Sequence, residues 1–122
     1  MSIICVGKVL IIQDSLSELD SISNYLEDQG YEIIKTHRAK AGLEIALEVR
    51  PTAIITDVVM PGRSGFELCR FFKSHYIYQN IPIVVCSAYN QEIYRMWARK
   101  QGADAYFTRP FVVEDLLNAI QA

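Results

Sequence analysis

Four short apolar runs of this sequence are followed directly by polar residues that could act together in chemistry. Gln13 and Asp14 follow the first run, and Asp57, Ser87 and Arg109 stand at the ends of three later ones. Taken singly, such residues are usually turn formers, helix caps or surface cations. Taken together, two neighbouring carboxylates favour a hard divalent cation such as Mg²⁺. A carboxylate can also attack phosphorus if a cation and a hydroxyl stabilise the phosphoryl oxygens.

The elements that must position these residues are short apolar runs that alternate with longer amphipathic stretches. Several runs are apolar at consecutive positions and rich in β-branched residues, which is typical of strands covered on both faces of a parallel sheet. The predicted strands cover 9–12, 31–34, 53–56, 81–85 and 105–108.

The stretches between the runs have the start and stop signals of helices. Capping boxes begin at Ser15 and Ser64, each with a glutamate three residues later, Glu18 and Glu67. Further helices are predicted over 39–49, from a cap at Asn90 to Gly102, and from Val113 to the chain end. Leu16, Leu19, Ile22 and Leu26 form the apolar stripe of the first helix, and Ile93, Met96 and Trp97 are expected mainly in the core, with Trp97 partly exposed.

Alternation of strands and helices predicts an α/β fold with an open, doubly wound sheet. We expect one domain over residues 1–122, with residues 1–7 as an N-terminal extension. Ligands of such sheets bind beyond the carboxyl ends of the strands, so Asp14, Asp57, Ser87 and Arg109 are expected to meet at one edge.

Composition limits the classes of partner. The chain has 12 basic and 14 acidic residues and a net charge of -2, which argues against a nucleic-acid backbone as the main partner. Three scattered cysteines cannot form a complete disulfide framework, and Cys69 and Cys86 are expected to be small buried hydrophobes. The sequence shows neither a membrane-spanning stretch nor a signal peptide, so we expect a cytoplasmic protein without a membrane partner.

Four segments, 9–15, 56–62, 85–88 and 102–111, resemble the motifs of CheY-like response regulator receiver domains, in order and over nearly the whole chain. The resemblance implies a flavodoxin-like (βα)5 fold, a five-stranded parallel sheet with strand order 2-1-3-4-5. Segments 95–97 and 100–106 more narrowly resemble stand-alone regulators of the PilH and PixH type, which act in cyanobacterial motility and phototaxis.

By this resemblance, Asp57 is the phosphoacceptor of a two-component signalling system. Asp14, Asp57 and the backbone carbonyl of Val59 would hold Mg²⁺. The family usually has an acidic residue where this chain has Gln13, so we expect weaker Mg²⁺ binding, with Gln13 contributing through a metal-bound water.

The same resemblance assigns the remaining site residues. Ser87 would contact the phosphoryl group and move its loop, and Tyr106 would be the aromatic switch. Arg109-Pro110 matches a Lys-Pro pair whose bond is usually cis. Arg binds phosphate well, but its planar fork is shaped differently from an ammonium group. In receivers, the positions of Val59 and Tyr89 help to control the water that hydrolyses the aspartyl phosphate.

The implied partners are a histidine kinase, for which the chemotaxis type is one candidate, and a downstream protein that binds the face of the fourth helix, fifth strand and fifth helix. The domain would turn over no separate substrate and would not be an enzyme. A rival hypothesis is a pseudo-receiver that acts as a phosphorylation-independent interaction or dimerisation module, which Gln13 and Arg109 favour. An aspartyl phosphatase is disfavoured because Val59 stands where its general acid would be.

Overall fold

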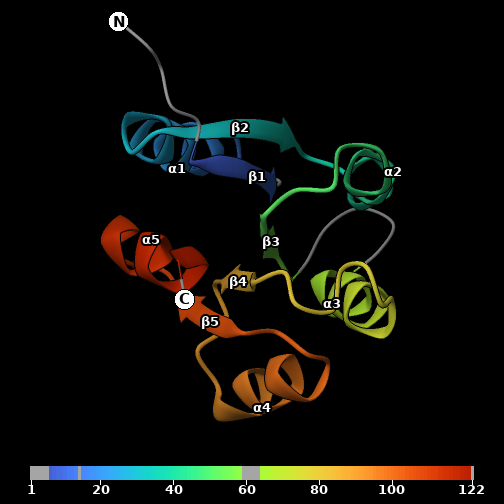
Figure 1. Ribbon diagram of the computed structural model, residues 1–122. Coiled ribbons are helices and arrows are strands. Elements are labelled where there is room, and N and C mark those ends of the chain that lie inside the picture. Colours follow the sequence, from blue (N-terminus) through green and yellow to red (C-terminus); the bar gives the residue numbers. More distant parts are fainter. Residues whose placement is uncertain (1–5, 14, 59–63, 122) are drawn as a thin grey trace, which may run out of the picture.

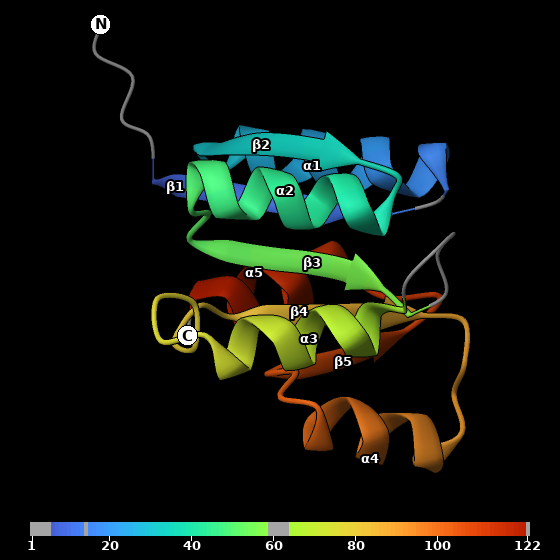
Figure 2. The same ribbon diagram turned by 90° about the vertical axis from the view of Figure 1, so that its right-hand side faces the viewer.

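The apolar runs form one parallel sheet of five strands in the order β2-β1-β3-β4-β5, as predicted (Figure 1). The computed structural model describes residues 6–13, 15–58 and 64–121. The strands are β1 (Gly7–Ile12), β2 (Tyr31–Thr36), β3 (Ala53–Asp57), β4 (Ile83–Ser87) and β5 (Ala105–Thr108). Their carboxyl ends point in one direction, so the residues that follow them gather at one edge of the sheet (Figure 2).

Helices cover both faces of the sheet, and this explains why the strands are apolar at consecutive positions. The helices are α1 (Leu16–Asp28), α2 (Ala39–Val49), α3 (Gly65–Ser74), α4 (Glu92–Lys100) and α5 (Val113–Gln121). On β1, Leu10 and Ile12 belong to the core beneath α2 and α3. Val9 and Ile11 belong to the opposite core, beneath α1 and α5.

Local sequence signals set two of the helix starts, those of α1 and α3. The hydroxyls of Ser15 and Ser64 accept hydrogen bonds from the backbone N–H groups of Glu18 and Glu67, as the capping boxes predicted. The predicted cap at Asn90 is wrong. α4 is preceded by Gln91, whose side chain makes no capping hydrogen bond.

Two strand starts differ from the predictions. Gly7 was expected in the N-terminal extension but pairs with Tyr31 as the first residue of β1. Gly7 and Lys8 pair with β2 alone, and pairing with β3 begins at Val9. β4 starts at Ile83 rather than at residue 81, because Pro82 has no N–H group to donate to the sheet.

The prediction that α4 contributes Ile93 and Met96 to the core is wrong. The side chains of these residues are 50% and 58% exposed, and Trp97, expected to be partly exposed, is 48% exposed. α4 lies beside the edge strand β5, so only a narrow side of the helix meets the rest of the protein (Figure 1). Ala98 is its buried residue. Within the described part of the chain, no helix is long and apolar enough to cross a membrane.

Candidate phosphoacceptor site

Strand pairing brings three of the expected site residues to one edge of the sheet. Asp57 at the end of β3 pairs with Cys86 of β4, and the next residue of β4, Ser87, pairs with Thr108 of β5. The backbone N–H of Arg109 then donates to the carbonyl of Ser87 at 2.9 Å. Asp57, Ser87 and Arg109 therefore stand at the ends of three adjacent strands, as the sequence predicted.

Asp57 and Arg109 form a direct ion pair. Arg109 Nη2 lies 2.9 Å from Asp57 Oδ2, and the two side chains are 25% and 14% exposed. The other carboxylate oxygen, Oδ1, accepts the backbone N–H of Val58 at 2.6 Å. The carboxylate is thus oriented by a backbone donor on one oxygen and by a guanidinium on the other, at a position that solvent still reaches. The Arg109–Pro110 peptide bond is cis.

Glu18 is a site residue that the sequence analysis missed. Its backbone makes the expected capping contact, but its carboxylate is directed into the site. Arg109 Nη2 donates to Glu18 Oε1 at 2.8 Å, and Arg109 Nε donates to Glu18 Oε2. Arg109 therefore bridges two carboxylates, Glu18 of α1 and Asp57 of β3. The only sequence signal was an acidic residue in the first turn of a helix that starts at this edge of the sheet.

Gln13 is buried next to Glu18. Only 1% of its surface is exposed, and its Nε2 group donates a hydrogen bond to Glu18 Oε1. Its Oε1 atom accepts the backbone N–H of Ser15 at 3.5 Å. The side-chain amide thus supplies a donor to a carboxylate that is 17% exposed. A second carboxylate at position 13 would instead repel Glu18.

The two carboxylates stabilise the protonated, positively charged form of Arg109. Burial alone would lower the pKa of the guanidinium, but the hydrogen bond to Glu18 and the negative charge of Asp57 raise the pKa above its ordinary value. Arg109 is therefore a permanent cation at this edge of the sheet. A cation placed there can bind and stabilise the oxygens of a phosphoryl group.

Ser87 and Tyr106 are connected through the backbone of Tyr89. The Ser87 hydroxyl accepts the Tyr89 N–H at 3.0 Å, and the Tyr106 hydroxyl donates to the Tyr89 carbonyl at 2.7 Å. Arg95 of α4 donates to the Tyr106 carbonyl and lies 5.4 Å from the centre of its ring. A movement of the loop after β4 would therefore change the contacts of both hydroxyls. Burial raises the pKa of the Tyr106 hydroxyl, which keeps it protonated and able to donate.

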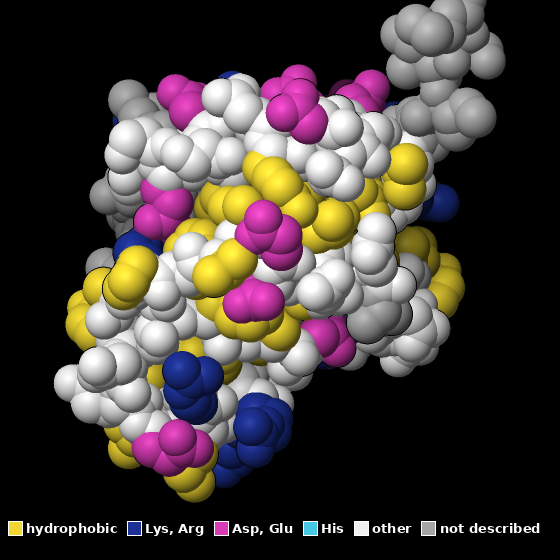
Figure 3. Space-filling view, turned by 90° about the vertical axis from the view of Figure 1, so that its left-hand side faces the viewer, with side chains coloured by type: hydrophobic (Ala, Val, Ile, Leu, Met, Phe, Trp, Pro, Cys, Tyr) yellow, Lys and Arg dark blue, Asp and Glu magenta, His cyan; other side chains and the backbone are white. Residues whose placement is uncertain are grey.

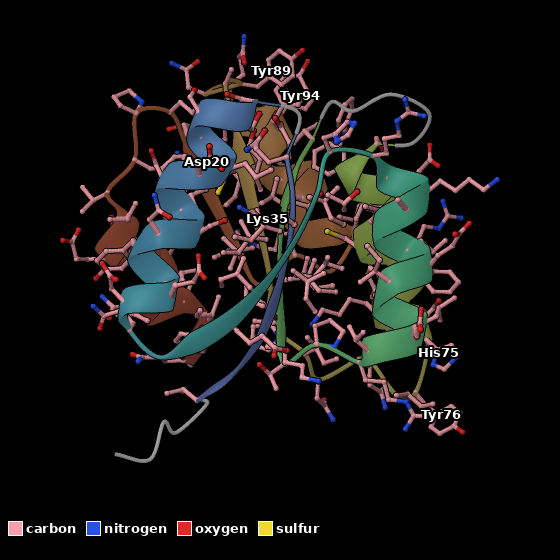
Figure 4. The ribbon with its side chains drawn as sticks, turned by 90° about the horizontal axis from the view of Figure 1, so that it is seen from above. Asp20, Lys35, His75, Tyr76, Tyr89 and Tyr94 are labelled. Carbon is pink, nitrogen blue, oxygen red and sulfur yellow. The ribbon has the colours of Figure 1, made fainter. Side chains whose placement is uncertain are left out.

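The ring of Tyr89 packs against α4. It stacks on Tyr94 with a centroid distance of 4.6 Å, and Figure 4 shows the two tyrosines together at one end of the molecule. His75 and Tyr76 lie at the opposite end (Figure 4). This stacking accounts for the position of the Tyr89 ring.

The oxygen atoms at this edge of the sheet are of the kind that bind a hard cation. Carboxylate oxygens are ligands that Mg²⁺ takes, and Asp57 presents them here, while Gln13 Oε1 accepts the backbone N–H of Ser15. The described residues contain no group of three His, Cys, Asp or Glu that could hold a metal. Two of the expected ligands, Asp14 and Val59, lie outside the described residues.

A groove of about 330 Å³ runs beside Arg109, between α1 and the segment after β5. Glu18 and Arg109 line it together with Ile22, Phe111 and Val113. Figure 3 shows hydrophobic side chains gathered across the middle of this face, where α1 and α5 meet. The groove gives the site residues an approach from the α1 side.

Both described cysteines are buried, as expected. They are free thiols with no exposed surface. Burial raises the pKa of Cys69 to about 12 and raises that of Cys86 as well. Neither thiol is therefore a reactive group at neutral pH.

Comparison with known proteins agrees with this geometry. The family model of the response regulator receiver domain matches residues 9–121. The chain belongs to the response regulator receiver family. It is also 31% identical to PilH of Pseudomonas aeruginosa over 116 residues, which covers 95% of this chain and 96% of that protein. The resemblance to PilH-type regulators is thus supported by sequence along nearly the whole chain.

Solved receiver structures have the same fold. The chemotaxis response regulator CheY4 of Vibrio cholerae superposes with a TM-score of 0.86 at 30% identity, covering 94% of this chain and 96% of that one. A response regulator receiver domain protein from Clostridium thermocellum gives a TM-score of 0.86 at 29% identity, covering 95% and 92%. This receiver is therefore a CheY-like module of two-component signal transduction.

Proposed function

We propose that this receiver accepts a phosphoryl group on Asp57 from a histidine kinase. The Asp57 carboxylate attacks phosphorus, the bond from phosphorus to the histidine nitrogen breaks, and an aspartyl phosphate forms. The observation that carries this proposal is the contact of Arg109 Nη2 with Asp57 Oδ2 at 2.9 Å, beside Ser87 on the next strand. It supports a nucleophile in contact with a cation, with a serine at the end of the neighbouring strand.

Arg109 and Ser87 would then contact the phosphoryl oxygens. Arg109 is permanently charged, and its planar fork can bind two oxygens at once. Mg²⁺ would be held by Asp14, Asp57 and the Val59 carbonyl, with Gln13 reaching it through a water. When bound, Mg²⁺ neutralises the negative charge that accumulates when a phosphoryl group approaches carboxylates.

The signal would leave through the face of α4, β5 and α5. The link from Ser87 through Tyr89 to Tyr106 supports this route, since both hydroxyls depend on one loop. α4 adds Ile93, Met96 and Trp97, which are exposed apolar side chains suited to a protein partner. We propose that the kinase, for which the chemotaxis type is one candidate, and this downstream protein act in the cytoplasm, and that the domain turns over no separate substrate.

The first prediction tests the phosphoacceptor. With Mg²⁺ and a small-molecule donor such as phosphoramidate, intact-mass spectrometry should detect one added phosphoryl group. Asp57→Asn should abolish it, because an amide is not a nucleophile toward phosphorus. Asp20→Asn is the matched control, since Asp20 is an exposed carboxylate of α1 that faces Lys35 at 3.6 Å (Figure 4). It should be modified like the parent protein.

Two results would contradict the proposal, and each points to a different alternative. An adduct that persists in Asp57→Asn would assign the chemistry to another residue. If the parent protein takes no phosphoryl group under conditions that modify CheY4 of Vibrio cholerae, the phosphorylation-independent module replaces this proposal.

A further inference from the structure

Glu18 is the residue whose role goes beyond the receiver pattern. The family pattern places two acidic residues after the first strand, and this chain has Gln13 at the first of these positions. The structure places another carboxylate, Glu18, against the Gln13 side chain and against Arg109. We propose that Glu18 is a positioning residue that replaces the missing negative charge and fixes Arg109 between two carboxylates. This inference rests on the proposed function, because it concerns the same site.

The number of charges at the site supports the idea that Glu18 replaces the missing acidic residue. Two acids after the first strand, the phosphoacceptor and a lysine make three carboxylates and one cation. In this chain Arg109 contacts two carboxylates, Asp57 and Glu18, and Asp14, which the family resemblance assigns to the site, would be the third. The charge of Glu18 is near enough to matter, because Arg109 Nη2 contacts both Glu18 Oε1 and Asp57 Oδ2, at 2.8 and 2.9 Å.

The chemistry of Gln13 fits the same interpretation. Its amide donates to Glu18 Oε1 in a place where its own surface is 1% exposed. A carboxylate at position 13 could not donate, and it would leave two like charges in contact at a poorly solvated point. Gln13 and Glu18 are thus a matched pair. The negative charge that the family pattern has at the end of the first strand is here carried by Glu18, in the first turn of α1.

Arg109 is also matched to this arrangement. A guanidinium has several N–H donors in a planar fork and can bridge two carboxylates, whereas an ammonium acts as a compact point charge. Arg109 uses Nε and Nη2 toward Glu18 and Nη2 toward Asp57. Without Glu18, Arg109 would pair with Asp57 alone. Its guanidinium would then compete with a bound cation for the Asp57 carboxylate.

The test measures Mg²⁺ affinity by calorimetry and NMR shifts, without any phosphoryl donor. Glu18→Gln should weaken Mg²⁺ binding by about three- to tenfold, as expected for one charge removed several ångströms from a divalent ion. Gln13→Asp adds a charge and should tighten binding. The charge swap Gln13→Asp/Glu18→Gln should return the affinity to within about twofold of the parent protein, because it restores both the net charge and an amide–carboxylate pair. Asp20→Asn should leave the affinity unchanged.

The outcomes separate this inference from the proposed function. Unchanged Mg²⁺ affinity in Glu18→Gln, no recovery in the charge swap, or no Mg²⁺ binding by the parent protein would each overturn the role of Glu18. If Glu18→Gln fails to fold, the Mg²⁺ affinity of the charge-swap variant still tests the role of Glu18. If the affinities follow the expected order but Asp57 takes no phosphoryl group, the proposed function fails while the role of Glu18 stands.

Discussion

Arginine at position 109 changes which side chains of the site contact one another. An arginine replaces the lysine of the family pattern, and its fork contacts Glu18 and Asp57 at the same time. A lysine at this position would offer a compact charge and would pair less well with two separated carboxylates. The substitution at position 109, the amide at position 13 and the carboxylate at position 18 are therefore physically coupled, and none can be judged alone.

We predict that two other residues set the lifetime of the aspartyl phosphate proposed at Asp57. Hydrolysis needs a water in line behind phosphorus, and an oriented water can change the rate by orders of magnitude. Val59 has no group that could hold a water, and the ring of Tyr89 is stacked on Tyr94 at 4.6 Å. We therefore predict slow decay of phosphorylated protein after the donor is removed.

Two variants test this lifetime. Val59→Asn and Tyr89→Glu each introduce a group that can orient water, and each should speed the decay by about tenfold or more. Decay is followed by intact mass at fixed Mg²⁺ concentration. Fast decay in the parent protein, unchanged by either variant, would refute the argument.

At the scale of elements, the start of α3 packs closely against Asp57, the proposed phosphoacceptor. Gly65 donates its N–H to the carbonyl of Val58 at 2.8 Å, and a Cβ atom at Gly65 would lie 2.0 Å from the backbone oxygen of Asp57. A backbone oxygen cannot move away as a side chain can. The helix can approach the end of β3 this closely only without a side chain at position 65.

We therefore predict that Gly65→Ala lowers the free energy of unfolding by about 1–3 kcal/mol or more, since overpacking forces the backbone to shift. Gly42→Ala in α2 is the matched control. Its Cβ would lie 2.5 Å from Ile12 Cδ1 and 2.8 Å from Ile12 Cγ1. These are side-chain atoms, which can shift where a backbone oxygen cannot, and alanine favours the helix. The urea unfolding curves should rank Gly42→Ala as the smaller loss, and a reversed order would contradict the backbone clash.

At the scale of the whole molecule, one network of ion-pair and hydrogen-bond contacts lies at the end of the sheet away from the candidate site. At the end away from Asp57, Lys73 Nζ contacts Asp104 Oδ2 at 2.8 Å and the carbonyl of Ile81 at 2.9 Å. Asp104 Oδ2 also accepts the N–H of Ile83 at 2.8 Å. This network joins α3 to the beginnings of β4 and β5, while the opposite ends of the strands carry the site.

Lys73→Ala should therefore destabilise the fold by about 1–3 kcal/mol, because it leaves partly buried acceptors without their charged donor. Mg²⁺ affinity and phosphorylation of Asp57 should be unchanged at temperatures where the protein remains folded. Lys8→Ala is the control, since Lys8 and Glu32 form an exposed pair at 3.8 Å and should contribute less than about 1 kcal/mol. Equal losses of unfolding free energy in the two variants would contradict this distinction.

The sequence by itself determined the order of the elements and the edge that carries the site. Strand runs and capping boxes act over a few residues, so they can be read locally. Because parallel strands end on the same side, the placement of Asp57, Ser87 and Arg109 followed from that order.

Only the tertiary structure decided which side chains become partners. Glu18 and Arg109 lie 91 positions apart, and nothing local to Glu18 distinguishes a capping residue from one that reaches into the site. The exposure of Ile93 and Met96 was likewise decided by the place of α4 beside an edge strand. Periodicity shows that a helix has an apolar side, but only packing determines whether the protein covers it.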